Sequence, residues 1–308
     1  MELKHKPYFI EKYKELLKED FDEFLEYSNK YSRKAIRVNT LKIDIDSLKD
    51  RMGVNWELIP VPWCKEGFWI KYKDGVRWDI GNTPEHQLGY IYVQDPASMI
   101  PAVVLNPKED ELVLDMCAAP GSKTSQLAQY MNNTGLLIAN DRDGKRLGAL
   151  GINLQRCGVY NAIITKMNGE RIKNAEFDKI LLDAPCSGTG TIRKNQKITE
   201  MYSENLVKRM AGIQWTLIKK AFQLLKKDGV LVYSTCTLEP EENEKIVSKL
   251  LEKHPDAVLE TIDLDIKKTN PITSFRGESF NPDVVKCLRI NPQSNDTEGF
   301  FVAKIRKK

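Results

Sequence analysis

Two cysteines stand in loops whose composition suits a reactive thiol rather than a buried one. Cys186 follows the apolar run 179–183 in a segment that reads DAPCSGTG, and Cys236 follows the run 230–234 in a segment that reads STCTLEPEEN. A cysteine inside an apolar strand is usually an inert core residue, and we assign that role to Cys287. In a polar loop rich in Gly, Pro and Thr, a thiolate can be stabilised and can reach a substrate, so Cys186 and Cys236 are candidate nucleophiles.

A tight loop of small residues follows another apolar run. The segment 115–124 reads DMCAAPGSKT, and such a loop at the start of a helix offers backbone N–H groups to a ligand. It matches neither the P-loop nor the GxGxxG fingerprint. Asp141 ends the next apolar run, about 20 residues further on, where an acid can bind a ribose diol. Alone, this acid could equally cap a helix, but the loop and the acid together favour a nucleoside-containing ligand.

Apolar runs alternate with helical segments from residue 107 onward. This alternation indicates an α/β domain with a parallel sheet covered by helices on both sides. Ligands of such sheets bind beyond the carboxyl ends of the strands, which is where the candidate loops lie. Two later strands, at 284–290 and 300–305, are close enough in sequence to pair antiparallel. The other expected strands are 112–116, 136–141, 162–165, 179–183 and 230–234, and the expected helices are 122–131, 143–157 and 203–226.

The first third of the chain has a mixed pattern that is typical of a small α+β unit. We therefore predict two domains, an N-terminal α+β domain at 1–106 and an α/β catalytic domain at 107–308. Within the first we expect one or two helices at 7–28, strands at 35–40, 56–59 and 67–71, a helix at 46–52 and a loop at 60–67.

Composition narrows the class of protein further. The 308 residues are 41% hydrophobic and 29% charged, with 18 Gly and 14 Pro, which excludes fibrous and low-complexity classes. No apolar run is long enough to cross a bilayer and no signal segment is visible, so we expect a cytoplasmic protein without membrane contact. Six cysteines without a CxxC pair, and only three histidines, argue against a zinc site and a disulfide scaffold. We expect no metal.

Basic residues concentrate in one stretch, although the net charge is only +4. Residues 193–227 contain nine Lys or Arg and two Glu. Such a run is most often a solvated helix face. The alternative is a surface that faces phosphates, together with the basic C-terminal residues 304–308. The basic residues of the stretch are Arg193, Lys194, Lys197, Lys208, Arg209, Lys219, Lys220, Lys226 and Lys227.

Several segments are shared with one enzyme family. The chain closely resembles the S-adenosylmethionine-dependent RNA cytosine-5 methyltransferases of the NOL/NOP/Sun type. The Pro-Cys-Ser and Thr-Cys-Thr motifs at two strand ends are the most discriminating feature, and the length is most like that of the compact archaeal tRNA enzymes. The matching segments are 37–40, 94–98, 115–124, 140–141 with Arg146, 183–190, 234–243 and 297–301.

This resemblance implies a Rossmann-like class I methyltransferase fold. We expect a mostly parallel, seven-stranded sheet, preceded by an RRM-like domain that binds RNA, and a protein that acts as a monomer. The implied cofactor is S-adenosyl-L-methionine. Asn168 stands where the family usually has an aspartate near the adenine. The implied cofactor contacts are Cys117, Ala118, Ala119, Pro120, Gly121, Ser122, Lys123, Asp141, Arg146, Asn168 and Asp183.

The resemblance also implies roles in the reaction. Cys236 would add to carbon 6 of a cytosine in RNA, most readily tRNA, and Asp183 would hydrogen-bond the ring near nitrogen 3. Cys186 would serve the release of the methylated base. Lys123 would orient polar groups of the site, or else be a surface lysine at a helix start. A ribosomal RNA substrate remains an alternative. A non-catalytic RNA-binding scaffold is another, against which both cysteines argue.

Overall fold

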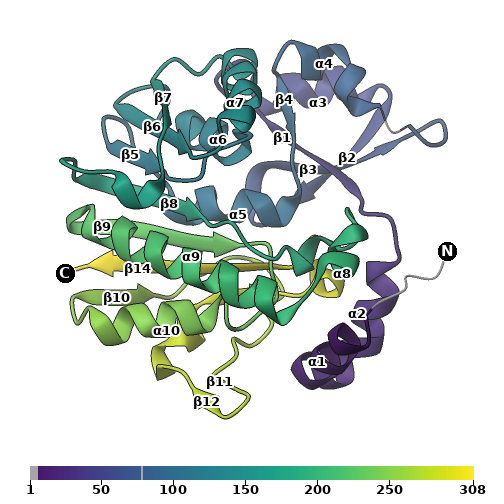
Figure 1. Ribbon diagram of the computed structural model, residues 1–308. Helices are drawn as coiled ribbons and strands as arrows, with labels where there is room; N and C mark the ends of the chain where they lie inside the picture. Colours follow the sequence, from purple (N-terminus) through teal and green to yellow (C-terminus); the bar gives the residue numbers. More distant parts are fainter. Residues whose placement is uncertain (1–5, 78) are drawn as a thin grey trace.

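The computed structural model describes residues 6–77 and 79–308, and it contains two larger sheets side by side (Figure 1). The N-terminal sheet has four antiparallel strands in the order β2-β3-β1-β4. The central sheet has a row of seven strands in the order β10-β14-β9-β8-β5-β6-β7, and β13 pairs with β14 beside that row. A two-stranded hairpin, β11–β12, lies apart from both.

The elements of the N-terminal part are α1 (Pro7–Leu17), α2 (Phe21–Ser28), β1 (Lys34–Val38), α3 (Ile45–Gly53), β2 (Trp56–Val61), β3 (Cys64–Tyr72), α4 (Pro84–Gln87), β4 (Ile91–Val93) and α5 (Pro96–Leu105). Those that follow are β5 (Leu112–Asp115), α6 (Ser122–Tyr130), β6 (Leu136–Asp141), α7 (Gly144–Cys157), β7 (Ala162–Lys166), β8 (Phe177–Asp183), α8 (Lys197–Met201), α9 (Glu204–Gln223), β9 (Leu225–Thr235), α10 (Glu244–Lys253), β10 (Ala257–Glu260), β11 (Ser274–Phe275), β12 (Glu278–Ser279), β13 (Leu288–Ile290), α11 (Pro292–Asn295) and β14 (Phe300–Lys307). Short 3-10 helices lie at Lys18–Asp20, Ile80–Asn82, Gly169–Arg171, Thr189–Thr191 and Pro282–Lys286.

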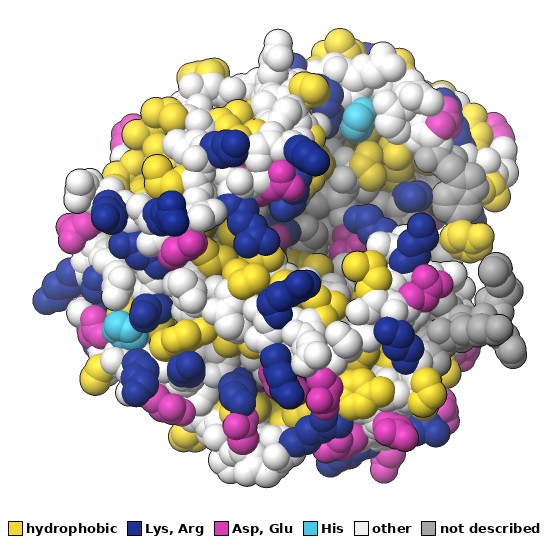
Figure 2. Space-filling view, viewed as in Figure 1, with side chains coloured by type: hydrophobic (Ala, Val, Ile, Leu, Met, Phe, Trp, Pro, Cys, Tyr) yellow, Lys and Arg dark blue, Asp and Glu magenta, His cyan; other side chains and the backbone are white. Residues whose placement is uncertain are grey.

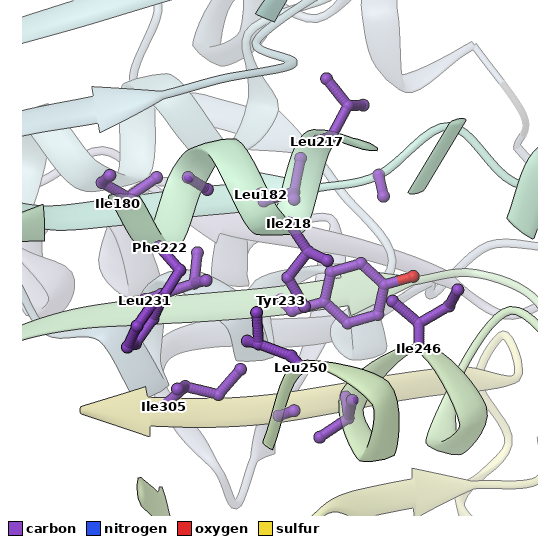
Figure 3. Packing of buried hydrophobic residues seen from close by; sticks show 14 of the residues in the cluster. Ile180, Leu182, Leu217, Ile218, Phe222, Leu231, Tyr233, Ile246, Leu250 and Ile305 are labelled. Atoms are coloured by element: carbon purple, nitrogen blue, oxygen red, sulfur yellow. The ribbon is translucent and has the colours of Figure 1, made fainter. Parts of the chain in front are cut away.

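The central strands of this sheet are buried on both faces, as predicted for α/β architecture, whereas the edge strand β7 is largely exposed. Strands β7, β6, β5, β8 and β9 are parallel, and β14 joins β9 antiparallel. Because side chains alternate along a strand, Leu182 and Tyr233 pack under α9 and α10, whereas Leu181 and Val232 pack on the opposite face with α5 and α6. Figure 3 shows the first of these packed layers, with Leu217, Ile218 and Phe222 from α9 and Ile246 and Leu250 from α10 closing over the strands.

The N-terminal sheet has the strand order and directions of an RRM-like βαββαβ unit, as expected. The predicted loop at 60–67 is wrong. Pro60 and Val61 continue β2, Cys64 begins β3, and only Pro62 and Trp63 form the turn between them. β2 is an edge strand, so the missing N–H of Pro60 removes no necessary hydrogen bond.

The predicted strand at 284–290 is also too long. A 3-10 helix occupies Pro282–Lys286, and β13 covers Leu288–Ile290 only. The Asn281 side chain accepts a hydrogen bond from the backbone N–H of Asp283, and Pro282 favours the first position of a helical turn. The expected antiparallel pairing with β14 is confirmed.

Helices α1 and α2 pack on the catalytic part of the chain rather than on the N-terminal sheet. They lie beside α8 in Figure 1, and their apolar side chains share a cluster with Ile192, Tyr202, Val207 and Leu238. Helix α5 also contacts both parts, since its buried face shares a cluster with side chains from β3 and from the central sheet. The division of the chain at residue 106 therefore remains a prediction. Within the described residues, no helix is both long enough and apolar enough to span a membrane.

The buried ion pair of Lys12 should dominate the docking of α1. Lys12 is 1% exposed and lies 2.5 Å from Glu239 Oε2 and 2.8 Å from Glu241 Oε1. Lys12→Met would leave the Glu239 carboxylate buried without its cation, which typically costs about 3–5 kcal/mol of unfolding free energy. Denaturant unfolding measures this loss. Lys14→Met, on the exposed side of the same helix, is the control and should change stability little. Equal midpoints for the two variants would contradict the assignment.

Candidate active site

The two cysteine loops meet at the carboxyl edge of the central sheet. Strands β8 and β9 pair in parallel, with Asp183 opposite Ser234. The loops that follow bring Cys186 Sγ to 3.4 Å from Cys236 Sγ. The hydrogen bond to Cys236 and burial raise the pKa of Cys186 well above its usual value, so Cys186 rests as a thiol.

Lys123 and Asp183 form an ion pair beside these thiols. Lys123 Nζ, from the first turn of α6, lies 2.8 Å from Asp183 Oδ2 and donates to Ser98 Oγ at 2.9 Å. Ser234 Oγ donates to Asp183 Oδ1 at 2.8 Å. Burial lowers the pKa of Lys123, but Asp183 more than compensates and the net pKa is raised, so the side chain stays an ammonium. Lys123 is therefore a buried site residue and not a surface lysine.

The loop 115–124 is fastened to the end of β6. The backbone N–H of Ala119 donates to Asp141 Oδ2 at 3.2 Å. Arg146, from α7, donates to the carbonyl of Ala119 and lies 3.5 Å from Asp141 Oδ2. Gly121 has φ +105°, which favours glycine at this turn into α6. The loop, the acid of β6 and Arg146 thus meet, as the sequence predicts.

Two cavities adjoin at this edge. One, of about 260 Å³, lies over the ends of β5, β6 and β8 and is walled by Asp141 and by Ile213 and Leu217 of α9. The other, of about 570 Å³, lies toward the N-terminal sheet. Both are lined by Cys117, Ala119, Arg146, Asp183 and Cys236. Two ligands, one in each cavity, would therefore meet beside Asp183 and the Cys236 thiol.

The predicted cofactor contacts divide between these cavities. Ala118, Pro120, Ser122 and Lys123 line the larger cavity, whereas Asp141 lines the smaller one. Gly121 lines neither, and a Cβ at this position would face Leu150 and Asn153 of α7. Asn168 is exposed and also lines neither. Its neighbours Gly169 and Glu170 reach the smaller cavity instead. Across the described residues, no group of three or more His, Cys, Asp or Glu could hold a metal ion.

Several lining residues were missed by sequence reasoning. Asp95 Oδ1 accepts hydrogen bonds from the N–H groups of Ala97, at 2.9 Å, and Glu298, at 3.3 Å. Burial, and then the neighbouring Glu298, raise the pKa of Asp95 to about 7. The segments 94–98 and 297–301 belong to the family resemblance, but the sequence analysis assigned no role to their residues. The missed residues are Tyr92, Gln94, Asp95, Ser98, Asn140, Arg142, Glu170, Thr191, Asn195, Glu298 and Phe300.

The basic stretch 193–227 does not form one surface. The Arg193 side chain is 3% exposed, pairs with Asp296 at 2.9 Å and donates to the carbonyl of Tyr31 at 2.8 Å, so it is a structural residue. Lys226 pairs with Asp178 at the amino end of the sheet, opposite the cysteines. Of the nine basic residues of this stretch, only Lys194 lines the larger cavity. In Figure 2, Lys and Arg side chains are spread over the whole face rather than gathered in one patch.

The basic C-terminal residues lie at the same amino end of the sheet. Lys304 pairs with Glu260 at 2.8 Å, and Arg306 pairs with the same carboxylate. Both line a cavity of about 580 Å³ that contains none of the candidate catalytic residues. They are therefore not phosphate contacts of the catalytic cavity.

Residues 102–306 match the family described as "16S rRNA methyltransferase RsmB/F", and residues 6–96 match the N-terminal domain of 16S rRNA methyltransferase RsmF. The chain belongs to the RsmB/F methyltransferase family. The resemblance to RNA cytosine-5 methyltransferases and the methyltransferase fold expected from it are thereby confirmed.

Individual relatives cover nearly the whole chain. A tRNA (cytosine(49)-C(5))-methyltransferase of Pyrococcus abyssi is 46% identical over 97% of this chain and 95% of its own. A ribosomal RNA small subunit methyltransferase F of Vibrio vulnificus is 43% identical over 97% of this chain. The match covers only 63% of the longer Vibrio protein. A crystal structure of a methyltransferase homolog from Pyrococcus horikoshii has a TM-score of 0.89 at 39% identity, covering 99% and 96% of the two chains. NSun6 from the same organism, solved with SFG, has a TM-score of 0.85 at 27% identity, covering 98% of each.

Arg193 and Lys194 should therefore behave differently although they are adjacent. Arg193→Ala should lower stability by about 1–3 kcal/mol, because the buried guanidinium and its bonds to Asp296 and to the Tyr31 carbonyl are lost. Lys194→Gln should leave stability unchanged. It should make the affinity for a tRNA transcript less dependent on salt, because the plot of log affinity against log salt loses the slope of about one phosphate contact. Thermal unfolding and fluorescence anisotropy across a salt series measure both effects. Lys219→Gln, remote on α9, is the control, and an unchanged slope in Lys194→Gln would remove it from the RNA surface.

Proposed function

We propose that the protein transfers a methyl group from S-adenosylmethionine to carbon 5 of a cytosine in tRNA. The observation that carries the proposal is the pair of thiols, 3.4 Å apart, at the junction of two cavities and beside the Lys123–Asp183 ion pair. One thiol can bond the base while the other remains free for a second step.

The tRNA substrate is supported by the relative from Pyrococcus abyssi, whose length this chain spans almost completely. The second candidate is ribosomal RNA, supported by the family description. Incubation with purified tRNA and ribosomal RNA, followed by mapping of bisulfite-resistant cytosines, distinguishes the two. Both cavities are built by one chain, which supports action as a monomer, and an enzyme of tRNA would work in the cytoplasm.

The smaller cavity fits S-adenosylmethionine. Asp141 offers carboxylate oxygens to a ribose diol, and Ile213 and Leu217 offer an apolar wall to an adenine. A Cβ on Gly169 would lie 2.8 Å from Leu217 Cδ2, so glycine lets this wall pack closely against Leu217. SFG, bound in the NSun6 structure, is an analogue of this cofactor. When bound, S-adenosylmethionine supplies an electrophilic methyl group.

The residues of the chain make cytosine reactive toward that methyl group. Carbon 5 is a weak nucleophile, but addition of the Cys236 thiolate at carbon 6 converts the ring into an enamine. Asp183, held by Ser234 and Lys123, is placed to hydrogen-bond the ring edge that gains a proton. Cys186 keeps its proton during the attack because its pKa is raised, so it does not compete with Cys236. After methyl transfer, and once its own proton has passed to solvent, Cys186 accepts the carbon 5 proton as a thiolate. The electron pair of that C–H bond re-forms the ring double bond, and Cys236 departs as a thiolate.

Removal of the Asp141 carboxylate should weaken cofactor binding. Asp141→Ala deletes the acceptors proposed for the ribose, and the loss of such a partner costs about 1–3 kcal/mol. Isothermal titration calorimetry with S-adenosylmethionine measures the change in Kd. Asp143→Ala is the matched control, since Asp143 is exposed and only caps α7 through Lys145 N–H. Equal affinities of the two variants would sink the assignment.

The two cysteines should give opposite phenotypes. Cys236→Ala should abolish methylation and leave no covalent complex, because no thiolate attacks carbon 6. Cys186→Ala should form the adduct and transfer the methyl group, but then stall with RNA attached to Cys236. A denaturing gel with labelled tRNA and cofactor shows the stalled complex as a slow band.

The reverse outcome is equally readable on the same gel. A slow band in Cys236→Ala and none in Cys186→Ala would exchange the two roles. Loss of folding in both variants, seen by circular dichroism, would return the thiols to the class of core residues.

A further inference from the structure

The peptide groups on both sides of Cys186 are held by two buried side chains. Gln214 Nε2, from α9, donates to the carbonyl of Pro185 at 2.9 Å. Glu242 Oε2 accepts from the backbone N–H of Ser187 at 3.0 Å. Gln214 Nε2 also donates to Glu242 Oε2 at 2.8 Å, which joins the two supports into one. We name Gln214 and Glu242 the Cys186 clamp.

Cys236 has a separate support of the same kind. Thr235 Oγ1 donates to Asn243 Oδ1 at 2.6 Å, and Asn243 Nδ2 donates to the carbonyl of Thr237 at 2.9 Å. One asparagine side chain thus spans the residues on both sides of the cysteine. We name Asn243 and the Thr235 hydroxyl the Cys236 clamp.

Each clamp takes one residue from the same turn, whereas its second residue comes from α9 in one clamp and from β9 in the other. Glu242 and Asn243 are neighbours in the turn between β9 and α10, yet their side chains hold different loops. Tyr233 OH donates to the carbonyl of Glu242 at 2.6 Å and fixes the backbone of that turn. Figure 3 shows Tyr233 within the packed layer beneath α9 and α10, so the turn is anchored to the core.

A third contact joins the two loops to each other. Thr237 Oγ1 lies 2.7 Å from Ser187 Oγ and 2.8 Å from Thr189 Oγ1. This hydroxyl bridge joins side chains of both loops, whereas the hydrogen bonds of each clamp are made to the residues on either side of one cysteine. The clamps are therefore the contacts that can act on one thiol at a time.

The Cys186 clamp contains buried polar atoms that lack hydrogen-bond partners. Gln214 and Glu242 are both fully buried, and among the described residues Gln214 Oε1 and Glu242 Oε1 are buried without a hydrogen-bond partner. An unsatisfied buried polar atom costs free energy, which the hydrogen bonds to the Pro185 carbonyl and the Ser187 N–H offset. A polar pair at this position is expected where it places a functional group.

We propose that Gln214 and Glu242 are positioning residues for Cys186, and that Asn243, with Thr235, is a positioning residue for Cys236. This inference rests on the proposed function, in which the two thiols act in successive steps. A shift of about 1 Å in a reacting group can cost about 100-fold in rate. Loss of one clamp therefore slows the step of its own cysteine and leaves the other step near its normal rate.

The test measures the two steps separately in the full chain, with labelled tRNA transcript and S-adenosylmethionine, by rapid quench and denaturing gels. In Gln214→Met the adduct should form within about twofold of the wild-type rate and break down at least about tenfold more slowly. In Asn243→Leu the adduct should form at least about tenfold more slowly and should not accumulate. Gln223→Met, the same substitution on the exposed end of α9, is the matched control and should change neither step.

Further variants separate positioning from folding. Glu242→Leu should reproduce Gln214→Met, and Glu242→Gln, which keeps an acceptor for Ser187 N–H, should restore breakdown. Thr235→Val should reproduce Asn243→Leu and serves in its place if that variant does not fold, as checked by thermal unfolding. Slowing of both steps by Gln214→Met, or accumulation of adduct in Asn243→Leu, would overturn the proposal.

The cysteine variants, measured in parallel, distinguish a failure of the proposed thiol roles from a failure of the proposed positioning residues. If Cys186→Ala and Cys236→Ala exchange phenotypes, the proposed roles fail. The proposal that each clamp positions its own cysteine is then still supported if each clamp variant matches its cysteine variant. Gln214→Met should slow the same step as Cys186→Ala, and Asn243→Leu the same step as Cys236→Ala. If each clamp variant slows a step other than that of its own cysteine, the clamps fail whatever the roles of the thiols are.

Discussion

The parallel pairing of β8 with β9 is the constraint on which the active site depends. Asp183 lies opposite Ser234 in this register, and the chain reaches Cys186 three residues later on one strand and Cys236 two residues later on the other. A slip of one residue would turn every side chain of a strand to the opposite face of the sheet. It would separate the thiols from each other and Asp183 from Lys123. The clamps, the hydroxyl bridge and the ion pair all presuppose this register.

A buried cation helps to hold the N-terminal sheet against this edge, together with the apolar contacts of α5. Arg37, on β1, is fully buried and lies at the interface with α6. A buried guanidinium is tolerated only when its donors are satisfied, so the interface favours a single relative orientation of the two sheets. The larger cavity has walls from both sides and inherits that fixed shape. The partners of Arg37 are Gln94, Ser122 O, Ser125 and Gln129.

Features that depend on local sequence could be predicted, and those that depend on distant partners could not. Apolar strands that end in polar loops identified Asp183, Cys186 and Cys236, because the strand and its loop are contiguous. Arg193 looked like one more basic residue, since its partners lie more than 100 residues away. Gln214 was hidden for a related reason. Helical periodicity reveals an apolar face, but it does not show that a polar side chain beside that face is fully buried.

Three buried carboxyl groups of the site lower the stability of the fold at neutral pH, which indicates that they serve the site rather than folding. Burial raises the pKa of Asp95, Asp115 and Glu242 to about 7 each. A carboxyl whose pKa is higher in the folded state than in the unfolded state stabilises the fold at low pH. That contribution is lost as the pH rises from about 4 to about 7. Asp95 and Asp115 line the larger cavity and Glu242 holds the Cys186 loop. Since these carboxyls oppose folding where the enzyme works, their presence is explained by the site, and the apolar layers on both faces of the sheet offset the loss.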